Sequence, residues 1–328
     1  MTPDLPAELK VALERKAEGL SRNDAARRAG AISQVYRSGG DSKTIRSDED
    51  ALAYALARMP ATYAAIAACL TAMIATRPDF APASLLDVGA GPGTATWAAA
   101  QAFSTLREFT LLDANASLHS LALELAHSVP ALSPMSYRQG DALKLLIDAQ
   151  SADLVVASYL VGELGQAERL RLADAMWSKT ADTLLIVEPG TPAGYERVIE
   201  LRAHLIAQGA HVIAPCPHDN ACPLIAPDWC HFSQRLARSR AHKHLKGAEL
   251  SFEDEKFSYV VLSRNPAVQR ASRVLTQPKI SKVAVTIKLC TKSGLEAVNV
   301  PHRDKANYSR AKKLNWGDAM DKKNPSPE

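Results

Sequence analysis

Three of the chain's five cysteines lie within one short segment, "CPHDNACPLIAPDWC", at positions 216–230. Their spacing, C-x₅-C-x₇-C, matches neither a ferredoxin run nor a zinc ribbon. Thiolates bind zinc and iron–sulfur clusters, and a four-ligand site needs one more donor. Cys290 lies in a basic segment, whereas Cys69 belongs to an alanine-rich stretch typical of a buried helix. The sequence therefore predicts a metal site formed by Cys216, Cys222, Cys230 and Cys290.

The spacing alone leaves the metal open. His218 or His231 could replace one thiol in a zinc site, because imidazole is a common zinc ligand. Three cysteines in one loop can also be coincidental. A ligand from Cys290 would connect the C-terminal part of the chain to the cysteine loop, which would stabilise a small region with little apolar burial of its own.

A second set of residues, Asp87-Val-Gly89-Ala-Gly91-Pro-Gly93, lies between a short apolar run and a helical pattern. Glycines in a strand-to-helix turn let the backbone approach a ligand at the helix N-terminus. An acid at the end of the next apolar run can accept hydrogen bonds from ribose hydroxyls. A further acid, in "QGDAL", could reach an adenine amino group. We predict a cofactor site formed by Asp87, Gly89, Gly91, Gly93, Asp113 and Asp141.

The order of these residues also indicates which cofactor binds. D-x-G-x-G-x-G followed by two acids resembles the class I S-adenosylmethionine-dependent methyltransferases. A dinucleotide-binding turn has the pattern G-x-G-x-x-G/A, which Gly89, Gly91 and Thr94 fit poorly. A purely structural turn in another α/β protein is the remaining alternative. We expect S-adenosylmethionine as the cofactor.

Residues that would handle a methyl acceptor are less distinct. Enzymes that methylate nucleobase amino groups carry N/D-P-P-Y/F after the fourth strand, where this chain has "ASYLVGEL". Tyr159 and Glu163 in that segment, and Glu188 in "VEPGT", are the candidate catalytic residues. Each has a structural alternative, as a packing residue, a helix start and a helix cap respectively. A cytosine-C5 nucleophile is not indicated, because Cys216 follows the sixth apolar run rather than the fourth.

These residues need a scaffold, and the chain predicts one. Between residues 84 and 206, five units pair an apolar run with a helical pattern, which predicts an α/β fold with a parallel sheet covered on both faces. The glycine turn makes it a Rossmann-like class I methyltransferase sheet. We expect a helical region at 1–80, the α/β domain at 81–265 with a Cys-rich and basic insertion at 216–250, and a small basic β-containing domain at 266–328.

Composition narrows the class of protein. Hydrophobic residues make up 47% of the chain and charged residues 23%, as in soluble globular proteins. The most apolar stretch, residues 51–75, is interrupted by Arg58 and Pro60 and predicts a buried helix pair rather than a membrane span. The first twenty residues mix acids with bases and contain no apolar signal core. We therefore expect a cytoplasmic monomer without membrane contact.

Charge is distributed unevenly. From Arg264 onward the chain carries 14 Lys and Arg against 5 Asp and Glu, whereas the rest carries 25 against 30. A basic tail predicts contact with a polyanion, and a solubilising tail is the alternative. The segment "RLARSRAHKHLKG" contains no acid and predicts a helix with one basic face. Because cations neutralise phosphates regardless of base sequence, we predict phosphate contacts at Arg235, Arg238, Arg240, Lys243 and Lys246, extended by Lys279, Lys282, Lys288, Lys312 and Lys313; the family resemblance described next implies that the phosphates are those of RNA.

Several segments together resemble one family over residues 45–320. They are "LLDVGAGPGTATWA", "VEPGTPAGYERV", "CPHDNACPL", "DWCHFSQRLARSRAHKHLKG", "EKFSYVVLSR" and "YSRAKKLNWGD". The family is the ribosomal small-subunit methyltransferase-like family, whose mitochondrial members are known as Rsm-twenty-two and methyltransferase-like-seventeen proteins. The resemblance implies association with the small ribosomal subunit and its 16S-type RNA. It also implies a 4Fe–4S cluster on the same four cysteines and favours iron–sulfur over zinc.

Two functions follow from these features. The first is a methyltransferase that acts on small-subunit ribosomal RNA, in which the cysteine site organises the RNA-binding region. The second is a ribosome-assembly factor that keeps the cofactor fold and transfers no methyl group. The missing N/D-P-P-Y/F favours the second, and the intact glycine turn with both acids favours the first. A small-molecule methyltransferase is a third alternative, and it leaves the basic tail unexplained.

Overall fold

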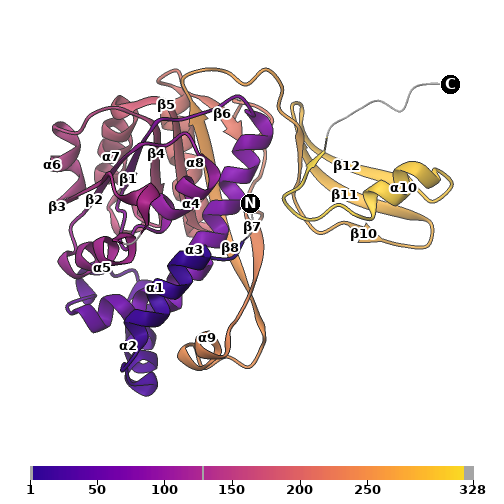
Figure 1. Cartoon of the computed structure of the whole chain (residues 1–328). Coiled ribbons are helices and arrows are strands. Elements are labelled where there is room, and N and C mark those ends of the chain that lie inside the picture. Colours follow the sequence, from indigo (N-terminus) through magenta and orange to yellow (C-terminus); the bar gives the residue numbers. More distant parts are fainter. Residues whose placement is uncertain (1–2, 128, 321–328) are drawn as a thin grey trace.

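The computed structural model describes residues 3–127 and 129–320 (Figure 1). Its larger sheet has the strand order β3-β2-β1-β4-β5-β8-β6, with β1 to β5 parallel and β8 antiparallel to both neighbours. The predicted Rossmann-like sheet is therefore confirmed. Its strands are β1 (Ser84–Val88), β2 (Glu108–Asp113), β3 (Met135–Gln139), β4 (Ala152–Ser158), β5 (Thr180–Pro189), β6 (His211–Ala214) and β8 (Phe252–Ser263).

Successive side chains of the parallel strands point to opposite faces and enter two separate cores. Leu85 and Leu111 belong to the first core, while their neighbours Leu86 and Leu112 belong to the second. Helices α3 (Asp48–Thr76), α4 (Thr94–Ala102) and α5 (Ala116–Ala126) cover the first face. Helices α6 (Ala142–Ile147), α7 (Gln166–Lys179) and α8 (Pro192–Ile206) cover the second.

The N-terminal helices α1 (Ala7–Ala17) and α2 (Arg22–Arg37) lead through the short turn η1 (Ser42–Thr44) into α3. The side chain of Ser47 caps α3 by accepting a hydrogen bond from the N–H of Asp50 at 3.2 Å. The expected helix pair is wrong: α3 is a single helix of 29 residues with Pro60 inside it. Proline removes one backbone donor, and burial of both flanking segments in the same core keeps the helix continuous.

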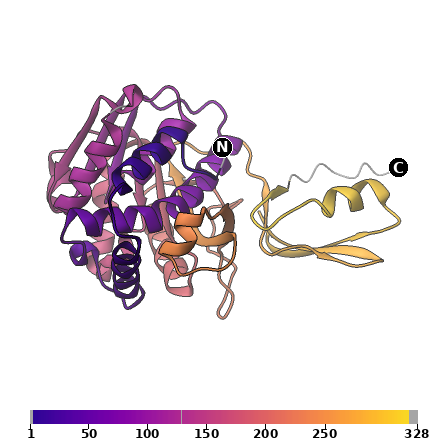
Figure 2. The same ribbon diagram turned by 60° about the horizontal axis from the view of Figure 1, so that its bottom comes forward.

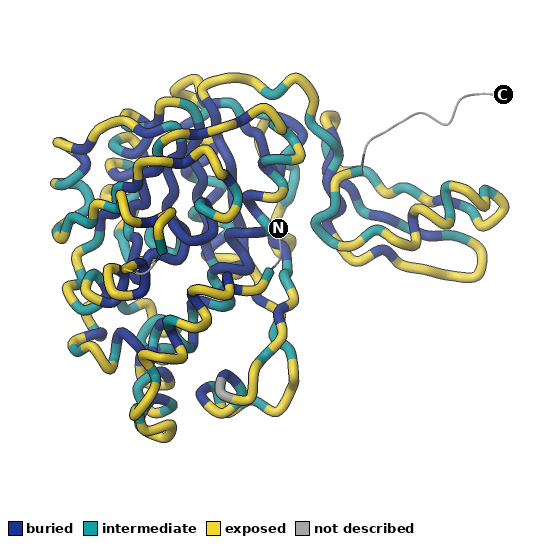
Figure 3. The backbone as a smooth tube through the Cα atoms, in the orientation of Figure 1, coloured by how far each residue is buried: buried dark blue, intermediate teal, exposed yellow. Residues whose placement is uncertain are grey.

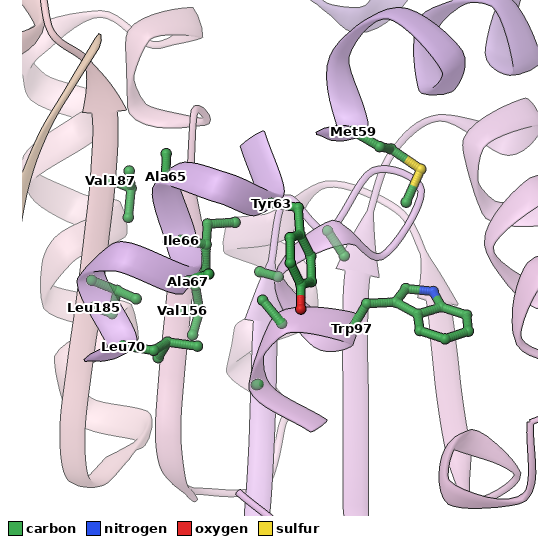
Figure 4. Packing of buried hydrophobic residues seen from close by; sticks show 14 of the residues in the cluster. Met59, Tyr63, Ala65, Ile66, Ala67, Leu70, Trp97, Val156, Leu185 and Val187 are labelled. Carbon is green, nitrogen blue, oxygen red and sulfur yellow. The ribbon is translucent and has the colours of Figure 1, made fainter. Parts of the chain in front are cut away.

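Helix α3 is the central packing element of the first core. Figure 4 shows Met59, Tyr63, Ile66 and Leu70 against Trp97 and the strands of the sheet. Among the described helices α3 alone is long and apolar enough to cross a membrane. Here most of its apolar side chains are buried against the protein's own sheet, as in the core helix of a globular domain.

Strand β7 (Phe232–Ala237) pairs with the first half of β8, and this long hairpin extends beyond the sheet (Figures 1 and 2). Its tip carries the short helix α9 (Arg240–Leu245), whose Leu245 packs against α2 and α3. The expected basic helix face is therefore wrong. Arg235 lies on β7, and Arg238 follows it before α9 begins, because pairing with β8 holds this part of the segment extended.

The C-terminal region has its own sheet and a small core of Val285, Ile287 and Leu289. The predicted hairpin is confirmed as β11 (Ala284–Thr291) with β12 (Gly294–Pro301), and the predicted helix as α10 (Lys305–Ala311). The sheet also contains β9 (Ser272–Val274), β10 (Lys279–Ile280) and β13 (Ala319–Met320). Figures 1 and 3 show this region beside the larger body, with an exposed outer surface. The sequence predicted regions at 1–80, 81–265 and 266–328. Residues 1–2, 128 and 321–328, one stretch in each region, lie outside the described residues.

Candidate functional site

The glycine turn joins β1 to α4 at the carboxyl end of the sheet. Gly89, Gly91 and Gly93 all have positive φ angles, of 70°, 53° and 80°, which residues with a side chain rarely adopt. A Cβ on Gly89 would also lie 2.8 Å from the side chain of Leu160. The N–H of Gly89 donates to the carbonyl of Leu112 at 2.8 Å, which ties the turn to β2. The conformation therefore favours glycine at all three positions, and at Gly89 a side chain would also displace Leu160.

Asp113 lies at the end of β2 and lines a cavity together with Gly89 and Gly91. Its Oδ2 accepts a hydrogen bond from the N–H of Gly91 at 2.9 Å, and its Oδ1 accepts one from the N–H of Asn115 at 2.8 Å. Burial raises the pKa of this carboxyl. The cavity opens to solvent and contains about 550 Å³ of space not occupied by atoms, with the open solvent at its mouth included.

Three predicted cofactor residues lie outside the lining of this cavity. Asp87 is fully buried, and its Oδ2 accepts hydrogen bonds from the N–H and hydroxyl of Thr96 at 3.1 and 2.8 Å. It holds the first turn of α4, and burial raises its pKa to about 7. Asp141 caps α6 by accepting from the N–H of Lys144 at 3.1 Å, and Gly93 begins α4. These residues support the site rather than line it.

The N-terminal region forms a roof over the cavity. Tyr36 and Ser42 line it from α2 and η1. The side-chain amide of Asn115 donates to the carbonyls of Ser42 and Ile45, both at 2.9 Å. Oε2 of Glu163 accepts a hydrogen bond from the N–H of Ser42 at 3.3 Å. Residues that follow β2 and β4, the two strands that flank β1, thus fasten this segment down.

Two of the three candidate catalytic residues line the cavity, Tyr159 and Glu163. Tyr159 has a φ of 58°, which is unusual for an aromatic residue and strains the backbone. Its hydroxyl donates to Oε1 of Glu255 at 2.9 Å, and Arg58 Nη2 donates to the same oxygen at 3.1 Å. Burial, with a smaller contribution from the nearby Asp113, raises the pKa of Glu163 to about 7.

Glu188, the third candidate, lies away from the cavity. It is fully buried, and its Oε2 accepts a hydrogen bond from Arg197 Nε at 2.9 Å. A Cβ on Gly162 would come within 3.1 Å of this carboxylate and 3.0 Å of the Arg197 guanidinium. The ion pair therefore packs directly beneath the loop that carries Glu163, where it supports that loop.

The sequence analysis missed the part of the site contributed by the N-terminal helices. Tyr36, Tyr54 and Arg58 all line the cavity. One signal was visible: Arg58 is the charge that interrupts an otherwise apolar stretch. Burial of a charged residue inside such a stretch generally requires a partner or a ligand. No comparable signal marked the tyrosines, because aromatic residues in helices usually serve the core.

All four predicted cysteine ligands line a second, separate cavity. Cys216, Cys222 and Cys230 reach it from the loop between β6 and β7, and Cys290 reaches it from β11 of the C-terminal region. Cys69 is fully buried in α3, as expected. His218 Nε2 lies 3.7 Å from Cys290 Sγ, whereas His231 stacks on Trp229 with ring centroids 4.8 Å apart.

No group of three or more His, Cys, Asp or Glu side chains in the described residues is close enough to hold a metal ion. Zinc would need its thiolates about 2.3 Å from one shared centre. A cluster would distribute its four cysteines over separate iron atoms. The four thiols share one cavity, and the described residues show neither a zinc site nor a cluster site.

Two buried arginines, Arg202 and Arg273, line the cysteine cavity. Arg202 Nη2 donates to the carbonyl of His218 at 2.8 Å, while its buried Nε has no hydrogen-bond partner in the described residues. Burial raises the pKa of Cys290 to about 12, so the thiol holds its proton in the absence of a ligand. The cavity thus brings four thiols together with two fixed positive charges, which would favour the thiolate forms if a ligand replaced their protons.

The basic residues predicted to contact RNA have different surroundings. Arg235 pairs with Asp254 at 2.7 Å, and Arg238 and Lys246 both pair with the largely buried Glu253. Their charges are therefore partly neutralised within the hairpin. Within the described part of the chain, Arg240 and Lys243 form no ion pair, and Lys279, Lys282, Lys312 and Lys313 are exposed on the C-terminal region.

A parallel sheet of this strand order, extended by the antiparallel strand β8, defines the class I methyltransferase fold when a glycine turn follows β1 and an acid ends β2. A family model described as "Mitochondrial small ribosomal subunit Rsm22" matches residues 48–321. The chain belongs to this family.

Relatives with curated names include the human "Ribosome assembly protein METTL17, mitochondrial", which is 30% identical over 297 residues. That match covers 84% of this chain and 63% of the human protein. The "Rsm22-cox11 tandem protein 2, mitochondrial" of Schizosaccharomyces pombe is 24% identical over 336 residues, which cover 85% of this chain and 44% of that protein. The chain thus spans less than two thirds of the length of these relatives.

Solved structures of similar fold include magnesium protoporphyrin IX methyltransferase (ChlM) from Synechocystis PCC 6803 with bound SAM, with 10% identity and a TM-score of 0.42. The match covers 79% of this chain and 98% of that chain. Precorrin-6y C5,15-methyltransferase from Geobacter metallireducens GS-15 has 13% identity and a TM-score of 0.40, covering 59% and 86%. The fold assignment rests on the strand order.

The expected cytoplasmic localisation is contradicted. The matching family is described as mitochondrial, and the human and yeast relatives are both named mitochondrial. The expectation rested on the composition of the first twenty residues. Composition at one end of a chain does not determine its compartment, so this expectation is withdrawn.

The raised pKa of Glu163 predicts a pH dependence of stability. Between its ordinary pKa of 4.5 and about 7, the folded protein retains a proton that the unfolded chain has lost. The proton on Glu163 therefore contributes its whole stabilisation below pH 4.5. This contribution to the free energy of unfolding is lost as the pH rises through 7. In Glu163→Gln, which cannot ionise, we expect the fall between pH 5 and 8 to be smaller by on the order of 2 kcal/mol.

Urea unfolding at several pH values measures this difference. Asp87 titrates in the same range and is present in both proteins, so the comparison isolates Glu163. The matched variant Glu249→Gln, at an exposed position, should follow the wild-type profile. The prediction would be contradicted if the free energy of unfolding changed with pH equally in wild type and in Glu163→Gln.

Proposed function

We propose that the chain binds S-adenosylmethionine in the cavity between the glycine turn and the N-terminal roof. The observation that carries this proposal is the contact between Asp113 and the N–H of Gly91 at 2.9 Å inside that cavity. It brings a ribose-binding carboxylate next to a turn whose backbone a ligand can approach. The cofactor would supply an activated methyl group. Asp113 would accept hydrogen bonds from ribose hydroxyls. Gly89 and Gly91 have no side chains, so the ligand could approach the backbone of the turn closely.

We further propose that the partner is the small ribosomal subunit and its RNA. Family membership and the human relative's name as a ribosome assembly protein support this assignment. The exposed cations of the C-terminal region, together with the exposed Arg240 and the half-buried Lys243 of α9, provide charges for phosphate contact. Arg235, Arg238 and Lys246 would contribute only by exchanging their internal acidic partners for phosphates.

We propose a 4Fe–4S cluster on Cys216, Cys222, Cys230 and Cys290. The four thiols share one cavity with Arg202 and Arg273, whose positive charges would stabilise thiolates and a cluster of negative charge. Tyr195 supports the arrangement, because its hydroxyl donates to Cys222 Sγ at 3.2 Å. A cluster at this place would join the C-terminal region to the methyltransferase-like domain.

Whether methyl transfer occurs divides two candidate functions. Tyr159 and Glu163 are positioned at the cavity and remain the candidate catalytic residues for an RNA methyltransferase. Residues 42–45 form part of the roof over the cavity and are held in place by Asn115. This favours the second function, an assembly factor that binds the cofactor without transfer, because a nucleobase needs an open path to the methyl group. A small-molecule methyltransferase would leave the basic C-terminal region without a role.

Transfer of a labelled methyl group from S-adenosylmethionine to small-subunit precursor particles separates the two functions. Incorporation that disappears in Asp113→Asn would establish an RNA methyltransferase. Binding to the particles that weakens as salt rises, without incorporation at any stage, would establish an assembly factor. Absence of both binding and incorporation would refute the proposed partner.

Cofactor binding can be tested with S-adenosylhomocysteine by calorimetry. We expect Asp113→Asn to weaken binding at least roughly tenfold, because it removes a charged acceptor for the ribose hydroxyls. Asp148→Asn is the matched control: Asp148 is exposed at the C-terminal end of α6 and outside the cavity, so its amide variant should bind within about twofold of wild type. A stronger effect at Asp148 than at Asp113 would contradict this assignment of the cavity.

The cluster can be tested by anaerobic purification with iron, sulfide and zinc analysis. We expect brown protein with equal amounts of iron and sulfide, and loss of both in Cys222→Ser, since the serine hydroxyl is a poor ligand for iron. Cys69→Ala, a change in the core of α3, should retain the cluster. Stoichiometric zinc in colourless protein, or metal-free protein that is folded, would refute the proposed cluster.

A further inference from the structure

We propose that Arg58 binds the α-carboxylate of the cofactor's amino-acid end, so that the cavity selects ligands that retain this group. The inference rests on the proposed cofactor function and names a contact within the same site. Arg58 projects from α3 into the cavity that Gly89 and Gly91 line. Its side chain is 32% exposed, so it is accessible from the cavity without being free in solvent.

The guanidinium of Arg58 has unused donors. It carries five N–H groups in a planar fork, and the fork matches the two oxygens of a carboxylate. Its hydrogen bond to Glu255 Oε1, at 3.1 Å, is made through Nη2. No other hydrogen bond of this side chain occurs among residues 3–127 and 129–320. A second carboxylate, supplied by a ligand, would satisfy the remaining edge.

The surrounding residues fix the orientation of Arg58. Glu255, which is only 8% exposed, accepts hydrogen bonds from both Arg58 and the hydroxyl of Tyr159 through the same oxygen. Arg58 Cζ also lies 6.0 Å from the centroid of the Tyr159 ring. The strained backbone of Tyr159 therefore has a structural result: it turns the ring and hydroxyl toward this ion pair. A guanidinium held in this way loses little side-chain entropy when it binds a ligand.

The charged side chains that line the cavity match the charge distribution of S-adenosylmethionine. Arg58 supplies the positive charge, while Asp113 and Glu163 are the acidic groups of the lining. S-adenosylmethionine has a carboxylate at one end and ribose hydroxyls toward the other, with a positive sulfonium between them. With Asp113 on the ribose, Arg58 is the residue of the lining with the charge and geometry for the carboxylate. An alternative role for Arg58 is purely structural, as the partner that holds Glu255 of the hairpin.

Two ligands that differ by one group separate these roles. S-adenosylhomocysteine carries the carboxylate, and decarboxylated S-adenosylhomocysteine lacks it but retains the amine. We expect Arg58→Gln to weaken binding of the first ligand roughly 10- to 100-fold, and to leave binding of the second within about twofold. Arg58→Lys keeps the charge without the fork and should show a smaller loss, again for the first ligand alone. Calorimetry with the full chain measures the affinities of wild type, Arg58→Gln and Arg58→Lys for both ligands.

Arg77→Gln is the matched control, because Arg77 ends the same helix and pairs with Asp182 outside the cavity. It should change neither affinity. Equal weakening of both ligands by Arg58→Gln would show a structural role, and no weakening of either would show that the carboxylate lies elsewhere; both results overturn the inference. Wild-type protein that binds neither ligand would instead refute the proposed cofactor function, and the inference with it.

Discussion

The pairing of β1 with β2 is the interaction on which the cavity beside the glycine turn depends. The carbonyl of Leu112 accepts hydrogen bonds from the N–H groups of both Gly89 and Ala90, at 2.8 and 3.1 Å, so the turn begins where the parallel ladder ends. The next residue of β2, Asp113, then continues the ladder with its side chain by accepting from Gly91. A short extension of the sheet thus positions the turn, the start of α4 and the carboxylate together.

Much of this arrangement could be predicted from the sequence, because it depends on local patterns. Glycines at a strand end and an acid at the end of the next strand fix backbone positions within a few residues. The contributions of Arg58, Tyr36 and Glu255 could not be predicted, because each depends on contacts between segments far apart in the chain. Pro60 illustrates the same limit: its local preference predicts a break, but burial of both flanking segments in one core outweighs the loss of one hydrogen bond.

At the cysteine loop, the cysteines that share a cavity could be predicted from the sequence, but the residues around them could not. Elimination among five cysteines selected the four that line one cavity, although Cys290 lies 60 residues beyond Cys230 in the chain and on a separate sheet. The sequence contained no sign of Arg202 or Arg273, which share the cavity, since arginines on a helix and on a short strand usually face solvent. The basic hairpin departs furthest from expectation, because the acids that neutralise it lie on the opposite strand, β8. A count of charge along a single segment does not include that strand.

Strand β8 belongs to both cavities. Glu255 anchors Arg58 and Tyr159 at one, and three residues later Ser258 lines the other, where its hydroxyl donates to the carbonyl of Cys230 at 2.8 Å. At about 3.3 Å per residue, the two attachment points are roughly 10 Å apart on one extended backbone. Pairing with β5 on one side and with β6 and β7 on the other fixes the register, and a slip by one residue would reverse every side chain. The two cavities therefore share one backbone, and the pairing that fixes the register of β8 also fixes the position of Glu255 at one cavity relative to Ser258 at the other.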